Sequence, residues 1–182
     1  MSVTTAAQTG IPGGTWALDP IHSTIGFEVN YLVGAFRGQF RDVQATLVAE
    51  GDSARLTGSA KVGSVDVKDE NLNAHLQSPD FFDAERHPEL TFESTEISRS
   101  GDEVRIAGEL RIKGVTQPVV LAGTIADPVE HPAGGRRIGL KLETNVDRTA
   151  FGVNWNMPLP DGNGALANEV KLVAELFFAE EA

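Results

Sequence analysis

Residues 16–40, WALDPIHSTIGFEVNYLVGAFRGQF, decide the fold. After the turn-forming pair Asp19-Pro20, apolar residues alternate with small or polar ones over about residues 23–33. This period of two predicts a strand with one buried face. The apolar row of this strand, with two phenylalanines that follow the next turn, comprises Ile25, Phe27, Val29, Tyr31, Phe36 and Phe40. Such aromatic bulk exceeds the needs of a thin sandwich layer, so the wall can enclose an apolar ligand as well as a core.

Seven further strands are predicted from the same alternation. The second runs from Phe36 to Leu47, and its parity changes near Arg41-Asp42, which predicts a bulge or bend there. Apolar alternation then recurs over residues 56–62, 90–92, 104–112, 119–125, 138–144 and 170–178. Short turns between strands imply antiparallel pairing, and eight antiparallel strands can remove their edges by closing into an up-and-down barrel. A barrel of this size is filled by side chains or holds one small ligand.

One segment, residues 69–87, interrupts the alternation between the third and fourth predicted strands. Leu72 and Leu76 have the spacing of one helical face. Ser78 is predicted to cap a second short helix with Pro79 in its first turn, and the apolar side of that helix would present Phe81 and Phe82 as a lid. The predicted fold is therefore all-β, an eight-stranded antiparallel barrel with a short helical insertion.

Length and charge set the class of protein. The 182 residues suit one domain, with a flexible tail over residues 1–14 and the barrel over residues 15–182. A net charge of −11 argues against nucleic acid as a partner, because phosphates require basic surfaces. No apolar run reaches the ~18 residues of a membrane helix, so no stable membrane insertion is expected. The first residues lack the pattern of a secretory signal, which leads us to expect a cytoplasmic location.

An ordered set of short motifs resembles the YceI-like, polyisoprenoid-binding family. The first pieces are Trp16 with Leu18-Asp19-Pro20, and His22-Ser23 followed by the alternating strand. Further pieces along the chain are His75-Leu76, Asp80-Phe81-Phe82-Asp83-Ala84, His87-Pro88, Ile112-Lys113-Gly114-Val115-Thr116, and Asp147-Arg148 with Phe151-Gly152-Val153. Each motif alone is weak, but their order covers about residues 15–178, which is nearly the whole chain.

The resemblance implies a lipocalin-like barrel with an elongated apolar cavity, and usually a homodimer. It also implies a bound long-chain lipid, such as a polyisoprenoid or isoprenoid quinone, that the protein sequesters or transports, with no other cofactor. Where the family often has a histidine at the end of the first strand, this chain has Tyr31. Beside the first apolar row, the candidate ligand contacts are Leu72, Leu76, Phe81, Phe82, Phe92, Phe151 and Trp155.

Polar residues leave alternatives open. His22 and Arg148 are candidate headgroup contacts, since guanidinium binds phosphate well, although structural pairing is the stronger reading of Arg148. Asp19, His22 and Ser23 could form a catalytic triad, but no nucleophile elbow is present, and a turn network is favoured. No histidine pair has metal-ligand spacing, so no metal site is expected, and His75 is interpreted as a residue that fixes a turn. A turn role is also favoured for Lys113 over contact with a headgroup. The alternatives to a lipid carrier are an enzyme acting on a lipid or quinone, and a stress-related protein with a filled barrel.

Overall fold

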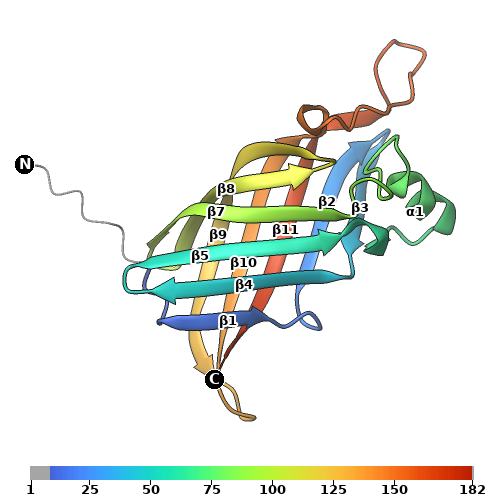
Figure 1. Cartoon of the computed structure of the whole chain (residues 1–182). Coiled ribbons are helices and arrows are strands. Elements are labelled where there is room, and N and C mark those ends of the chain that lie inside the picture. The colour runs from blue at the N-terminus through green and yellow to red at the C-terminus, as the bar shows by residue number, and fades with distance from the viewer. Residues whose placement is uncertain (1–8, 182) are drawn as a thin grey trace, which may run out of the picture.

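The computed structural model describes residues 9–181 and contains one closed antiparallel barrel (Figure 1). Eight strands form the closed ring in the order β1-β4-β5-β7-β8-β9-β10-β11, and β1 pairs with β11 to complete it. A second arm, β2-β3-β6, continues from β11. The strands are β1 (Gly14–Leu18), β2 (Thr24–Tyr31), β3 (Gly34–Phe40), β4 (Val43–Glu50), β5 (Ser53–Lys61), β6 (Val65–Asp66), β7 (Glu89–Ser100), β8 (Glu103–Ile112), β9 (Val115–Glu130), β10 (Arg136–Asp147) and β11 (Leu166–Glu180).

The predicted eight-stranded barrel is confirmed, and two bends together with one missed strand explain why eleven strands are present. The predicted second strand divides into β3 and β4 at Arg41-Asp42, where the parity change had indicated a bend. The third continues from β5 through the 3-10 turn η1 (Val62–Ser64) into β6. The sequence prediction missed β1, which lies before the Asp19-Pro20 turn. Both β1 and β2 pair with the same edge of β11, at Phe178–Glu180 and at Leu166–Glu175 respectively.

The turn between β1 and β2 is held by the network that the sequence favoured over a triad. The Asp19 Oδ1 atom accepts hydrogen bonds from the backbone N–H groups of Ile21, at 2.9 Å, and His22, at 3.4 Å. Ser23 Oγ accepts a hydrogen bond from the backbone N–H of Phe177 at 2.9 Å. The Asp19 and Ser23 side chains therefore accept hydrogen bonds from backbone N–H groups where the chain turns from β1 into β2.

The helical insertion lies between β6 and β7 and contains one helix, α1 (Glu70–Gln77). Asp69 caps its first turn by accepting a hydrogen bond from the Leu72 N–H at 2.9 Å. The second helix predicted from Ser78 is wrong, because residues 79–86 form turns. Ser78 instead ends α1: its backbone N–H and its hydroxyl both donate to the His75 carbonyl, at 3.1 and 2.6 Å. Asp83, with φ of 53°, lies in the left-handed region, which is incompatible with a continuing helix.

The predicted tail ends earlier than residue 14. Residues 1–8 lie outside the described part of the chain, but Thr9 and Ile11 are buried. Ile11 belongs to the core cluster at the β1 end of the barrel. Trp16 donates a hydrogen bond from Nε1 to the Pro12 carbonyl at 3.2 Å, which fixes the approach to β1. The packed part of the described chain therefore includes residues 9–14.

Two apolar clusters divide the barrel along its length. One is solidly packed around Trp16, Leu47, Ile106 and Phe178, each at most 1% exposed. The other gathers at the α1 end and includes Phe27, Phe40, Leu76, Phe81 and Phe151. Among residues 9–181, no helix is long and apolar enough to cross a membrane.

Candidate functional site

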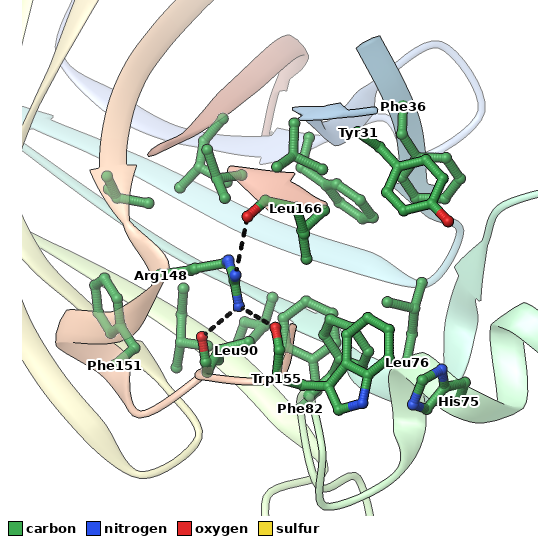
Figure 2. Close-up of a pocket in the computed structure, with 18 of the residues that line it drawn as sticks. Tyr31, Phe36, His75, Leu76, Phe82, Leu90, Arg148, Phe151, Trp155 and Leu166 are labelled. Carbon is green, nitrogen blue, oxygen red and sulfur yellow. Dashed lines mark hydrogen bonds between the residues drawn. The ribbon is translucent and has the colours of Figure 1, made fainter. Parts of the chain in front are cut away.

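A cavity of about 250 Å³ opens at the α1 end of the barrel (Figure 2). Its wall consists of residues from β2, β3, β7, β8, β10 and β11, together with the helical insertion, η2 (Arg148–Phe151) and the segment that follows η2. We call it the outer chamber. Its lining is apolar apart from four side chains with polar atoms, namely Tyr31, His75, Arg148 and Trp155.

A second cavity of about 130 Å³, the inner chamber, lies deeper in the barrel. It is lined by Ile25 and Phe92, and its only side chains that carry polar atoms are those of Ser59 and Thr91. The side chains that line both chambers, here called the waist, are Phe40, Leu90, Ile112 and Leu172. Because the two chambers share the waist, they lie next to each other along the barrel, and a chain that passed the waist would occupy both.

Glycines in the strands make room for the aromatic lining. Gly38 on β3 pairs with Phe27 on β2. A Cβ atom at Gly38 would clash with the Phe27 ring, and it would lie only 2.7 Å from Cγ1 of Val67. Gly108 on β8 pairs with Ser94, and a Cβ atom there would clash with the ring of the nearby Phe92. The inward position of both rings therefore depends on the absence of a side chain at a neighbouring glycine.

An aromatic lid covers one side of the outer chamber. The His75 ring of α1 makes edge-to-face contacts with Phe81 and Trp155, with ring centroids 5.0 and 4.9 Å apart. Phe81 and Trp155 themselves lie 5.3 Å apart. The Nε2 atom of His75 lies 3.0 Å from Oδ2 of Asp80, so the ring is fixed from two sides. The lid thus joins the helical insertion to the segment after η2.

Lys113, in the turn between β8 and β9, anchors the lid to the barrel. Its Nζ donates to the Pro79 carbonyl at 2.7 Å and to the Gly152 carbonyl at 3.3 Å. The two acceptors belong to the two segments that meet in the lid. A turn role for Lys113, favoured from the sequence over a headgroup role, is consistent with these bonds.

Arg148 lies in the wall of the outer chamber and is only 6% exposed. Its guanidinium donates to the backbone carbonyls of Val153 and Trp155, both at 2.8 Å, and of Ala167 at 2.9 Å. Figure 2 shows the bond to Trp155 and a longer one, of 3.4 Å, to the Leu166 carbonyl. Burial lowers the pKa of the guanidinium, and the neighbouring Asp147 acts in the opposite direction. Among the described residues, no carboxylate lies within ion-pair distance of it. Arg148 therefore fixes the path of residues 153–168 and places an unneutralised positive charge beside the chamber.

His22 does not belong to this site. Its side chain is 66% exposed at the β1–β2 turn, where Nδ1 lies 2.6 Å from Oδ2 of Asp19. It lines neither chamber, so the structure does not support it as a headgroup contact for a ligand held there.

The structure brings the other predicted residues together. All thirteen predicted apolar contacts line one of the two chambers, with Ile25 and Phe92 in the inner chamber. Direct contact of these residues with a ligand stays a prediction. The sequence prediction missed His75, which had been assigned to a turn, and several aliphatic residues on strands. Val170 and Leu172 are examples of such aliphatic residues. The alternation of apolar residues on β11 places both on one face, and that signal could have identified them as candidate ligand contacts.

Three comparisons with known proteins agree with this geometry. Residues 16–178 match the YceI-like domain. The chain belongs to the YceI-like family. It is 28% identical to protein YceI of Escherichia coli O157:H7, over 84% of this chain and 78% of that protein. It is 30% identical to the UPF0312 protein of Azotobacter vinelandii, over 84% of this chain and 79% of the relative.

Solved structures share the fold at lower sequence identity. BcnA of Burkholderia cenocepacia superposes with a TM-score of 0.76 at 22% identity, over 88% of this chain and 98% of that one. A polyisoprenoid binding domain from Saccharophagus degradans superposes with a TM-score of 0.67 at 12% identity, over 91% and 98% of the two chains. These likenesses show that solved proteins share the barrel fold of this chain.

Proposed function

We propose that this protein binds a long-chain lipid of the isoprenoid class in its two chambers, and that it sequesters or transports this lipid. The observation that carries the proposal is the elongated apolar cavity, because unfilled space lined by aromatic and aliphatic side chains is suited to an apolar chain. Membership of the YceI-like family supports it, as does the shared fold with a domain named for polyisoprenoid binding.

Burial of the chain supplies the binding free energy. Each buried methylene contributes about 0.8 kcal/mol, so one five-carbon isoprene unit contributes roughly 3–4 kcal/mol before the cost of ordering the chain. A few units therefore give tight binding without any charged contact. Selectivity then depends on chain length, since a longer chain passes the waist and occupies the inner chamber as well.

The polar side chains of the outer chamber define where the head of the lipid lies. Tyr31, His75 and Trp155 border the opening, and their polar atoms point away from the aliphatic part of the wall (Figure 2). A head with hydrogen-bonding groups is placed there at little cost, whereas the waist offers it no partner. The positive charge of Arg148 lies deeper and favours a head or linkage with electronegative oxygen atoms over a cationic one.

The test is organic extraction of the purified native protein followed by mass spectrometry. We expect a long-chain species in near-stoichiometric amount. Its repeated absence from protein produced in several hosts, together with no binding of geranylgeraniol by the extracted protein, would refute the proposal. A homodimer, implied by the family resemblance, is a separate prediction that light scattering of the same sample checks.

The alternatives differ in what they require of this site. A filled barrel requires a packed interior, whereas the two chambers leave about 250 and 130 Å³ unfilled. Catalysis by His22 on a bound lipid requires that its imidazole reach the cavity, which the geometry at the β1–β2 turn does not allow.

A further inference from the structure

Exposed apolar side chains, here called the rim, lie next to Tyr31 and Trp155 on one side of the outer chamber. The rim comprises Leu32 and Val33 at the tip of the β2–β3 hairpin and Met157 in the segment after η2, which are 54%, 104% and 39% exposed. The two parts lie side by side, because the Leu32 N–H donates to the Ala165 carbonyl at 2.9 Å and the Ala165 N–H donates to the Met157 carbonyl at 2.8 Å. The exposed side chains of the rim are therefore carried by neighbouring backbone segments and are not scattered over the surface.

The rim stands out from the rest of the surface by its lack of charge. Residues 30–36 contain no charged side chain, and residues 154–165 contain only Asp161, in a chain of which 23% is charged. The one tyrosine of the chain, Tyr31, and one of its two tryptophans, Trp155, lie at the same opening. Contiguous exposed apolar surface marks interaction sites, and Tyr and Trp are the side chains enriched where an apolar phase meets water.

The backbone of Leu32 gives an independent reason to assign the rim a role. Its φ of 50° lies in the left-handed region, where asparagine and glycine are accommodated more easily than an aliphatic residue. Since the Leu32 side chain is half exposed, its packing inside the fold does not account for this choice. A strained residue with an exposed apolar side chain at the opening of a cavity points to a use outside the folded chain.

We infer that the rim docks on the surface of a bilayer of electrically neutral lipids. Leu32, Val33 and Met157 would enter the interfacial layer, and Tyr31 and Trp155 would lie at the level of the lipid headgroups. The chamber then opens directly toward the acyl chains, so a lipid passes between bilayer and cavity without crossing water. The net charge of −11 and the position of Asp161 disfavour anionic lipid. This inference rests on the proposed function, since it describes how the cavity is loaded.

The test is flotation of the full chain with vesicles of phosphatidylcholine. The double variant Leu32→Asn, Val33→Ser removes the aliphatic tip, and asparagine also suits the backbone at position 32. The matched control is Val129→Ser, which changes another exposed valine, 66% exposed, on β9. Through the register of β9, β10 and β11, Val129 aligns with Ala179, whereas Tyr31 aligns with Leu166, so the two sites are roughly 40 Å apart along the strands.

We expect the double variant to lose vesicle binding by about tenfold or more and the control to retain it, because two aliphatic side chains no longer leave water. Replacing part of the phosphatidylcholine with phosphatidylglycerol is expected to weaken wild-type binding. Equal flotation of the double variant and the wild type would overturn the inference, as would a wild type that binds geranylgeraniol in solution but does not float. A wild-type dimer that becomes monomeric in the double variant, with flotation unchanged, assigns the rim to a second copy and overturns it too. Failure to bind geranylgeraniol without vesicles counts against the proposed function instead.

Discussion

The substitution Ala174→Leu tests whether a bound chain passes the waist. Ala174 lies on β11 opposite Ile25 and lines the inner chamber. The larger side chain adds three carbon atoms to a space of about 130 Å³ and occupies room that a bound chain would otherwise use. The outer chamber does not include this position. A ligand long enough to reach the inner chamber therefore loses space there, and a short ligand does not.

The size of the effect follows from the displaced methylenes. About three methylenes at about 0.8 kcal/mol each amount to about 2.4 kcal/mol, or roughly a 50-fold rise in the dissociation constant. The assay is displacement of cis-parinaric acid by geraniol, farnesol, geranylgeraniol and a longer polyprenol. We expect the loss of affinity to grow along this series and to be absent for geraniol.

The matched control is Ala122→Leu, which makes the same change in the groove on the outer surface of the sheet. It should leave all four affinities unchanged. A uniform loss across the series for Ala174→Leu, or an unchanged affinity for the longest alcohol, would refute a binding mode that includes the inner chamber.

Three further predictions concern the outer chamber with its lid and the opposite, β1 end of the barrel. Arg148→Met leaves buried carbonyls without a donor, and the free energy of unfolding should fall by about 3 kcal/mol in urea denaturation, with Arg148→Lys intermediate. Lys113→Met frees the Pro79 carbonyl of the lid, so stopped-flow binding and release of cis-parinaric acid should both accelerate roughly three- to tenfold while the dissociation constant changes less. At the β1 end of the barrel, the hydrogen bonds from Arg136 hold the pKa of Glu180 below its usual range. This contribution to stability is present above the unfolded-state pKa and is lost as the pH falls through the folded-state pKa, so thermal unfolding of Glu180→Gln should depend less on pH in the acid range.

Hydrophobic periodicity predicted most of the barrel because each strand buries one face. The inward row on β2 was identified by parity alone, and so was the bend at Arg41-Asp42. β1 escaped because Trp16 and Leu18 give too short an alternation before the turn to distinguish a strand from a loop. The prediction of a second helix was wrong because Ser78 caps the C-terminus of α1. The sequence alone does not show whether a serine ends one helix or begins the next.

Tyr31, Arg148 and Trp155 were identified as candidate contacts, but the arrangement of the polar side chains could not be predicted, because it depends on contacts between distant segments. Arg148 finds its acceptors in a loop with no regular structure, whose path is fixed only once β10 and β11 pair. His75 had a satisfactory local explanation as a turn residue, and only the folded chain places Trp155 against its ring. The alternation of apolar residues identified the apolar wall, whereas the arrangement of polar side chains in the outer chamber is a property of the tertiary structure.

The closure of the ring between β1 and β11 has a consequence for synthesis of the chain. The strand that completes the barrel, β11, is synthesised after the other ten strands, and it covers the edges of β1, β2 and β10 together. Until its 15 residues dock, the nascent chain is an open sheet with unpaired edges and an exposed apolar interior. Truncation within β11 would therefore produce an aggregating sheet and not a smaller barrel, and the yield of soluble protein depends on how fast this final strand pairs.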